Sequence, residues 1–198
     1  MDHQKAQVLA KLDEALSQNL VDEDVAPLLV SINNIEELVT TSSCSGRVQV
    51  ISLPGPGDKR RSKVLGKWHR PVSDREVMDS ISSWDGEGEL HFLVQPLLIH
   101  IRCRDLVSAV KLRNLGHGMG LKFSTIRSLK LDKRGDPLRW GTVVELLGTE
   151  RIEVPVDGII GGVLETCIPE WVKKGNSLLR RTKGHIPVLK QELDDNGL

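Results

Sequence analysis

The residues that could do chemistry gather in one stretch, TTSSCSGRVQVI, which runs from Thr40 to Ile51. Hydroxyls, a thiol, a glycine and a guanidinium arrive together, directly before an alternating apolar run. The stretch could be a nucleophile loop, in which Cys44 or a serine attacks a substrate. It could also be a cradle for an anion or polar ligand, built from hydroxyls, backbone N–H groups near Gly46 and the side chain of Arg47. A polar structural turn is the third interpretation.

The ligand cradle is favoured by the motifs found in the rest of the chain. A nucleophilic cysteine needs a nearby base. The chain has candidate histidines, but the sequence alone cannot place one of them beside Cys44. A GxSxG nucleophile elbow is absent, and PGPGDKRRS (54–62) lacks the GK[ST] ending of a phosphate-binding loop. The run GHGMG (116–120) follows a predicted helix rather than a strand, so we do not interpret it as a dinucleotide-binding motif.

Helices are predicted by apolar residues at spacings of three and four and by their end signals. Ser73 and Glu76 form the pattern of a capping box. The predicted helices are 3–19, a second one starting near Asp22, a short one after Ser73, 104–118, and 169–193 with an interruption near Gly184 and Pro187.

Strands are predicted by alternating, β-branched segments. They cover 47–53, 63–69, 89–103 (one strand or a strand pair, with a bulge or edge at Pro96), 121–131, 140–148 and 151–158. The first two are predicted to form a hairpin across the basic loop 54–62, which argues against a purely parallel sheet. We therefore predict an α+β fold with a mixed, partly antiparallel twisted sheet and flanking helices.

Length and composition bound the organisation of the chain. With 198 residues and 39% hydrophobic content, we expect a single compact domain, 1–198, in which N-terminal helices (1–37) and a C-terminal helical segment (169–198) flank a core with the site (38–160). No apolar run approaches the roughly 20 residues of a membrane span, and the acidic start is not a signal peptide. We expect a cytoplasmic protein. Three distant cysteines without a CxxC motif favour neither a disulfide framework nor a zinc knuckle.

The charges are unevenly distributed, although the formal net charge is zero. Residues 1–37 carry 2 basic and 8 acidic side chains, 47–70 carry 7 basic and 1 acidic, and 102–139 carry 10 basic and 3 acidic. The two basic blocks could fold onto one positive face, which is typical of a polyanion binder. Alternatively, they are scattered over the surface as solvated charge.

Five blocks of the chain carry a family resemblance, in the order TTSSCSGRVQVI, KWHRPV, PLLIHIRCRDLVSAVKL, GLKFSTIRS and ERIEVPVDG. Over about residues 36–160, they resemble the tRNA wybutosine-synthesising protein 3 family in its short archaeal form. The resemblance implies an S-adenosyl-L-methionine-dependent methyltransferase that modifies a nitrogen of a tricyclic wyosine-type guanosine derivative beside the anticodon of tRNA-Phe. It implies the anticodon loop of tRNA-Phe as partner, and a fold other than the Rossmann-type methyltransferase fold, in agreement with the missing glycine fingerprint.

The resemblance also implies a signature loop formed by Ser42, Ser43, Cys44, Gly46 and Arg47. These residue types suit a clamp for the cofactor or the base. Gly46 lets a ligand approach the backbone, and Arg47 can pair with a carboxylate or a phosphate. Ser43 is also a candidate catalytic hydroxyl. We interpret Cys44 as a packing residue, because methyl transfer from a sulfonium needs no covalent intermediate.

Further site residues are expected on the strands. Trp68 could stack on the base or face the cofactor's sulfonium, or it could be a core tryptophan. His69 and His100 are candidate catalytic residues that accept or orient a proton. The alternatives are a surface histidine on a basic strand for His69 and a core histidine with satisfied hydrogen bonds for His100. Adjacent strand residues face opposite sides, so Trp68 and His69 share a pocket only if a bulge intervenes. The same alternation lets at most one of Ser124 and Arg127 line the pocket.

Contacts to RNA phosphates are expected from two basic groups, because such contacts hold an RNA without reading its sequence. These residues are Lys59, Arg60, Arg61 and Lys63, and Lys130, Lys133, Arg134 and Arg139. The rival hypothesis is a non-catalytic RNA-binding module with a basic face, and a cysteine-dependent hydrolase is a third. We expect no metal, and the sequence leaves the oligomeric state open.

Overall fold

The computed structural model describes residues 3–54, 62–159 and 162–198. Over these residues, every strand pair is antiparallel. The helices are α1 (His3–Ser17), α2 (Ala26–Asn34), α3 (Asp74–Ser82), α4 (Leu106–Gly118) and α5 (Gly162–Asn196). The strands are β1 (Leu38–Cys44), β2 (Arg47–Leu53), β3 (Lys63–Trp68), β4 (Glu89–Gln95), β5 (Leu98–Cys103), β6 (Thr125–Leu131), β7 (Pro137–Leu147) and β8 (Ile152–Pro155). The α+β class is confirmed, and its strands form two four-stranded sheets.

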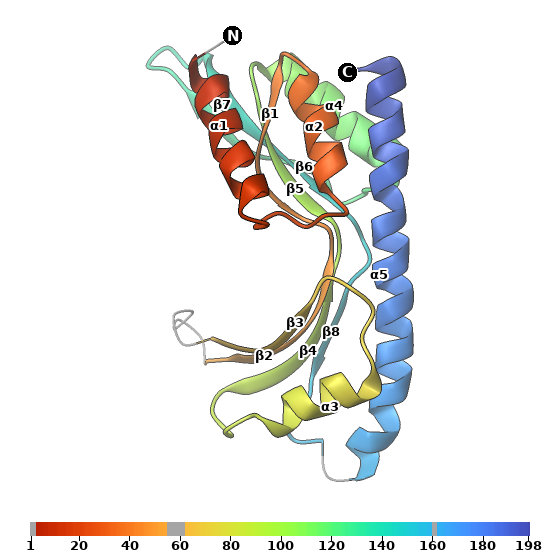
Figure 1. Cartoon of the computed structure of the whole chain (residues 1–198). Coiled ribbons are helices and arrows are strands. Elements are labelled where there is room, and N and C mark those ends of the chain that lie inside the picture. The colour runs from red at the N-terminus through yellow and green to blue at the C-terminus, as the bar shows by residue number, and fades with distance from the viewer. Residues whose placement is uncertain (1–2, 55–61, 160–161) are drawn as a thin grey trace. The chain divides into compact units, whose positions relative to one another are not determined.

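The chain divides into two compact units, each with its own sheet and apolar core (Figure 1). Unit 1 contains Met1–Ser45, Leu97–Thr149 and Thr182–Leu198, and unit 2 contains Gly46–Pro96 and Glu150–Arg181. The expected single domain thus contains two units, each assembled from segments that are distant in the sequence.

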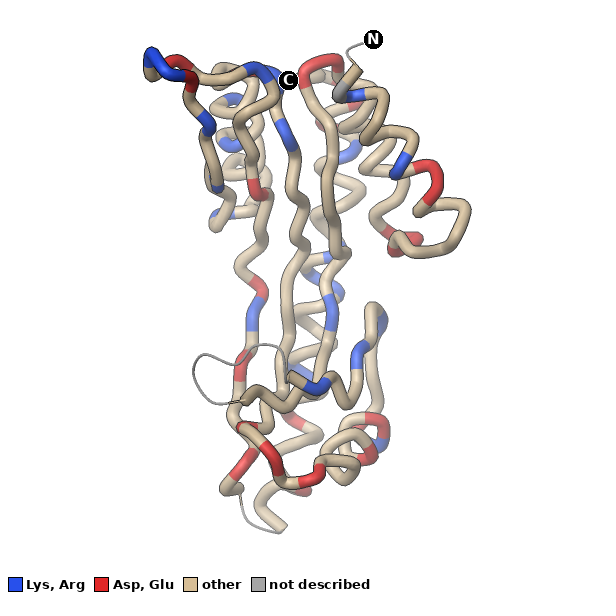
Figure 2. The backbone as a smooth tube through the Cα atoms, turned by 90° about the vertical axis from the view of Figure 1, so that its left-hand side faces the viewer, with Lys and Arg blue, Asp and Glu red and all other residues tan. Residues whose placement is uncertain are grey.

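The sheet of unit 1 has the strand order β1-β5-β7-β6. Ile99 and Ile101 of β5 are fully buried and belong to a core that α2, α4 and the end of α5 complete. Because side chains alternate along a strand, His100 and Arg102 project from the opposite face. We call this second surface, with Ser42, His100, Arg102 and Glu145, the polar face of unit 1. In Figure 2, several basic positions lie along the strands of this unit and around the β6–β7 turn.

The sheet of unit 2 has the order β3-β2-β4-β8. The predicted hairpin of β2 and β3 is confirmed. Phe92 of β4 is fully buried and stacks on Trp171 of α5, with ring centroids 6.2 Å apart. A Cβ atom at Gly175 would lie 3.0 Å from the side chain of Val94, so glycine lets α5 lie close against β4.

The capping box of α3 is confirmed. The Ser73 hydroxyl accepts a hydrogen bond from the Glu76 backbone N–H, and the Glu76 carboxylate accepts one from the Ser73 N–H at 2.9 Å. Arg70 also donates to Glu76, at 2.6 Å. The hydrogen bonds from Arg70 and then Ser73 lower the pKa of Glu76 to about 2.

The hydroxyl-rich stretch proved to be a strand where a loop was predicted. Residues 40–44 belong to β1, and the chain turns only at Ser45 and Gly46, whose φ of 99° favours glycine. Pairing with β5 and burial of Leu38 and Val39 stabilise the strand. Tertiary context therefore outweighs the turn preference of the serines.

The predicted interruption near Gly184 and Pro187 is wrong, because α5 is continuous through both residues. Ile186 and Leu189 are buried in the core of unit 1, and this packing offsets the local cost of glycine and proline. Pro96 does separate two strands, β4 and β5. Among the described helices, none has both the length and the apolar character of a membrane span.

Candidate functional site

A row of polar side chains crosses the polar face of unit 1. The antiparallel register places Ser42 of β1 opposite His100 of β5, and His100 opposite Glu145 of β7. On the other side of β7, Arg127 of β6 reaches the Glu145 carboxylate. Opposite residues on paired strands have Cβ atoms about 4.5–5.5 Å apart, so strand register alone brings these groups within contact distance.

Hydrogen bonds join these groups into one chain. Ser42 Oγ lies 2.7 Å from His100 Nδ1, and His100 Nε2 lies 2.7 Å from Glu145 Oε2. A carboxylate only accepts hydrogen bonds, so His100 Nε2 carries the proton and donates a hydrogen bond to Glu145. In a neutral ring Nδ1 is then unprotonated, and it accepts a hydrogen bond from the Ser42 hydroxyl. We call this hydroxyl–imidazole–carboxylate chain the relay. It is the type of arrangement that lets a hydroxyl pass a proton to a base.

The relay runs from a buried carboxylate to an exposed hydroxyl. Glu145 is only 8% exposed, and the His100 side chain is 21% exposed, whereas Ser42 is exposed. The ion pair with Arg127 offsets the desolvation of the Glu145 carboxylate. A substrate can therefore reach the relay at Ser42, while the Glu145 carboxylate stays buried at the other end.

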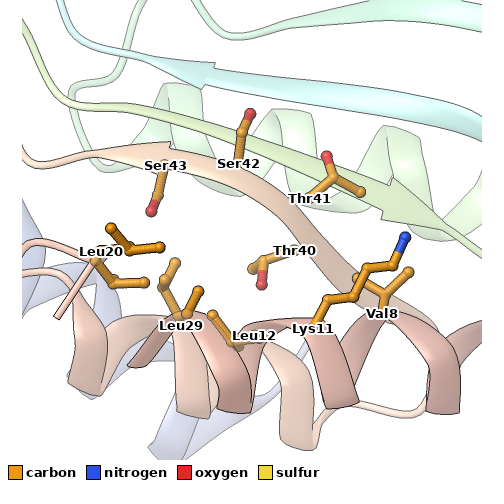
Figure 3. A pocket seen from close by; sticks show the side chains of 11 residues that line it. Val8, Lys11, Leu12, Leu20, Leu29, Thr40, Thr41, Ser42 and Ser43 are labelled. Carbon is orange, nitrogen blue, oxygen red and sulfur yellow. The ribbon is translucent and has the colours of Figure 1, made fainter. Parts of the chain in front are cut away.

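An irregularity in β1 sets the direction of its hydroxyls. The register with β5 shifts between Thr40 and Ser42, and such bulges re-aim side chains beside functional sites. In Figure 3, the Thr40 and Ser43 hydroxyls point toward the helix side chains, and the Ser42 hydroxyl points away from them. The strand therefore serves two sites, one on each side.

A cavity of about 460 Å³ lies on the side that Thr40 and Ser43 face. It is lined by Val8, Lys11, Leu12, Ala15, Leu20, Val21, Leu29, Thr40, Thr41, Ser42 and Ser43. Asn33 donates to the Thr40 hydroxyl at 2.8 Å, whereas the Ser43 hydroxyl has no hydrogen-bond partner among the described residues. One wall is hydroxyl-bearing and the other mainly apolar, and the volume falls within the roughly 300–1,000 Å³ of small-molecule sites.

The structure places three of the predicted site residues on or beside β1: Ser42 and Ser43 line the cavity, and His100 is the centre of the relay on the other face. Cys44 is the last residue of β1 and is half-buried. Gly46 occupies the turn that follows.

Arg47, Trp68 and His69 belong to unit 2. Arg47 Nε donates to Gln95 Oε1 at 2.6 Å. Trp68 packs against the core of unit 2 and lies over Gly66, where a Cβ atom would overlap its ring. His69 directly follows β3. Their roles in the site stay predictions.

Of the two basic groups expected to contact RNA, the structure describes the second in full and only one residue of the first. Lys59, Arg60 and Arg61 lie outside the described residues. Lys63 forms an ion pair with Asp85, and this hydrogen bond raises the pKa of Lys63. The second group belongs to β6, β7 and the turn between them, in unit 1: Lys130, Lys133, Arg134 and Arg139.

Glu145 is a site residue that the sequence prediction missed. The sequence does contain a signal for it: Glu145 is the one charged residue in the strand-like run GTVVELL. A carboxylate is rarely buried without a partner, so this position indicates a paired, functional carboxylate. Its partner Arg127 faces the relay, while Ser124 is buried and accepts a hydrogen bond from the Leu147 N–H at 3.1 Å.

Comparisons with known proteins agree over nearly the whole chain. Residues 3–195 match the family model described as Methyltransferase TYW3. The chain is 40% identical over 195 residues to the tRNA(Phe) 7-((3-amino-3-carboxypropyl)-4-demethylwyosine(37)-N(4))-methyltransferase 1 of Thermococcus kodakarensis, covering 98% of this chain and 93% of the relative. It is 39% identical over 192 residues to the Pyrococcus horikoshii protein of the same name, covering 96% and 93%.

Solved structures show the same fold. The structure of the PH1069 protein from Pyrococcus horikoshii aligns with a TM-score of 0.84 at 38% identity, covering 98% of this chain and 95% of the other. A hypothetical protein from Aeropyrum pernix aligns with a TM-score of 0.68 at 23% identity, covering 88% and 98%.

Proposed function

Because the chain belongs to the methyltransferase TYW3 family, we propose that it methylates N(4) of a 4-demethylwyosine-type nucleotide in tRNA(Phe), with S-adenosyl-L-methionine as donor. The target nucleotide lies beside the anticodon, and the reaction takes place in the cytoplasm. The observation that carries this proposal is the position of Ser42, which lines the cavity beside β1 while its hydroxyl points away from the helix side chains and bonds His100 in the relay.

The cavity suits the proposed donor. Its apolar wall, with Leu12 and Leu29, fits a planar adenine, and the Ser43 hydroxyl can bond a ribose or an amino group. Lys11 supplies a positive charge for the carboxylate of the methionine part. When bound, S-adenosyl-L-methionine would supply a methyl group activated by its positive sulfur. The predicted contributions of Cys44, Gly46, Arg47 and Trp68 to this site stay predictions.

The residues of the relay would manage the proton. The new N–C bond forms as the S–C bond of the donor breaks, and the accepting nitrogen must lose its proton. We assign this proton to the Ser42 hydroxyl, which passes its own proton to His100 Nδ1. Glu145 then stabilises the imidazolium, and Arg127 keeps the carboxylate in place. His69 is the alternative acceptor.

Alignment of the reactants would contribute most of the acceleration. Well-oriented reactions gain roughly 7–11 kcal/mol from positioning. A nucleotide in an anticodon loop can be unstacked and held more cheaply than one in a duplex.

The proposal is tested with tRNA(Phe) from a strain blocked at this methylation step. The purified protein with S-adenosyl-L-methionine should add one methyl group, detected by mass spectrometry of the nucleosides. Ser42→Ala and His100→Ala should each lower the single-turnover rate about 10²-fold, the smaller end of general acid–base effects. Ser177→Ala, an exposed position on α5, is the matched control and should keep the wild-type rate.

Two results would count against these assignments. Wild-type protein that binds the donor but adds no mass would exclude the methyltransferase proposal for this substrate. Full activity of both relay variants would move proton acceptance to another group. Calorimetric titration with S-adenosyl-L-methionine distinguishes the methyltransferase from the rival hypothesis, because a non-catalytic RNA-binding module should not bind the donor and should release no heat.

A further inference from the structure

A second hollow, of about 540 Å³, lies on the polar face of unit 1 beside α1. It is lined by Gln7, Val8, Lys11, Arg102, Lys130, Leu138, Arg139, Trp140, Gly141 and Val143. These described lining residues include four cations and no carboxylate. We call this site the basic hollow.

Three of its cations lack a counter-ion within the described protein. Arg102, Lys130 and Lys11, which also lines the cavity beside β1, form no ion pair with any described residue. Arg104, two positions after Arg102, is by contrast neutralised by Glu36, Glu37 and Asp105. Arg102 is half-buried, and a guanidinium withdrawn from water without a partner costs free energy. The basic hollow is therefore suited to an anion.

The backbone beneath the hollow is held in an unusual conformation. Trp140 has a φ of 60°, in the left-handed region that non-glycine residues rarely adopt. Its N–H donates to the Arg104 carbonyl at 2.9 Å, and its side chain is buried. Conformations of this kind persist where the surrounding structure enforces them, and they cluster at ligand sites.

We propose that the basic hollow binds a backbone phosphate of the anticodon arm of the tRNA. This inference rests on the proposed function and names the surface that positions its substrate. Arg102 and His100 lie two residues apart on the same face of β5, which corresponds to roughly 6.6–6.8 Å. A phosphate held by Arg102 would therefore place a neighbouring nucleotide at the relay. Because phosphate contacts carry no base information, the hollow would supply affinity and register, and the cavity and relay would supply selectivity.

The experiment measures binding without catalysis. Arg102→Gln with Lys130→Gln should raise the Kd for unmodified tRNA(Phe) about tenfold at low salt. In a plot of the logarithm of the binding constant against the logarithm of the salt concentration, the slope should become shallower by about 0.7–0.9 for each phosphate that the variant no longer neutralises. The affinity for S-adenosyl-L-methionine should remain that of the wild type. The matched control is Lys111→Gln with Arg113→Gln, which removes the same charge from α4, on the apolar side of the sheet.

The outcomes separate this proposal from the methylation proposal. An unchanged Kd and salt slope, or an equally weakened α4 control, would overturn the assignment of the hollow to RNA. If the wild type bound AMP, the Arg102/Lys130 variant did not, and tRNA binding were unchanged, the hollow would be assigned to a free nucleotide instead. If the wild type methylated no tRNA but the variant still bound tRNA more weakly than the control, the RNA site would stand and the proposed reaction would fail. Circular dichroism spectra of the variants, compared with that of the wild type, check that each variant is folded.

Discussion

At the scale of single residues, the relay depends on one buried carboxylate. Glu145 accepts hydrogen bonds from both His100 and Arg127, and it orients the imidazole so that Nδ1 faces Ser42. It is a positioning residue, because it acts through His100 rather than on the substrate.

Glu145→Gln should therefore slow the methyl-transfer step while leaving donor binding intact. The amide can present its N–H to the imidazole, which favours the wrong tautomer, and it leaves Arg127 without a charge partner. We expect the single-turnover rate to fall about 10²-fold, with little change in the Kd for S-adenosyl-L-methionine. A merely structural role would instead lower stability and weaken donor binding in step with the rate, and urea denaturation of the variant tests this.

At the scale of secondary-structure elements, α3 shows how a local sequence pattern becomes a hydrogen-bonded helix end. The capping box satisfies two backbone N–H groups at the start of the helix. Arg70, from outside the helix, adds an ion pair to the same Glu76 carboxylate. The element therefore carries a titratable contribution to stability.

The pH dependence of this contribution follows from the pKa of Glu76. Its folded-state value of about 2 lies below the unfolded value of about 4.3. The stabilisation is therefore complete above the unfolded value and disappears as the pH falls through about 2. In urea denaturation, the difference in midpoint between the wild type and Glu76→Gln should be largest near about pH 6 and vanish near about pH 2. It should be small, because the ion pair is exposed to solvent.

The control for this prediction is Asp79→Asn, an acid-to-amide change on the same helix with an i,i+4 ion pair but no cap. It should show a smaller pH-dependent difference. Equal behaviour of the two variants would mean that the cap adds nothing beyond general charge effects.

At the scale of the whole molecule, charge is distributed unevenly along a chain whose formal net charge is zero. Much of the positive charge lies in two blocks, one in each unit: residues 47–70 in unit 2 and residues 102–139 in unit 1. A polyanion such as tRNA is attracted by such blocks independently of its base sequence.

Reversing the charge of the first block tests its contribution. Arg60→Glu with Arg61→Glu should weaken the binding of all tRNAs to a similar extent and flatten the salt slope, and S-adenosyl-L-methionine should still bind normally. Filter-binding titrations at several salt concentrations measure both quantities. Lys173→Glu with Lys174→Glu, an equal change at exposed positions of α5 in the same unit, should have the smaller effect. If both variants retained the wild-type slope, the basic loop would be ordinary solvated surface.

The features that the sequence determined by itself are local. The β2–β3 hairpin, the capping box of α3 and the strand break at Pro96 all follow from residues close together in the chain. Periodicity, turn residues and caps act between neighbours, so they can be recognised without the fold. The signature block and the histidine of the relay also came from the sequence, through the motifs of the family.

The tertiary structure alone decided how distant segments meet. Ser42 and His100 are 58 residues apart, and His100 and Glu145 are 45 residues apart. Their hydrogen bonds depend on which strands pair and in which register, and burial of the opposite face of the sheet sets that register. The same burial made a strand of the hydroxyl-rich stretch and kept α5 helical through Pro187. Within a helix, glycine costs about 1 kcal/mol and proline about 3 kcal/mol relative to alanine. Core packing can outweigh such local costs only once the distant segments have come together.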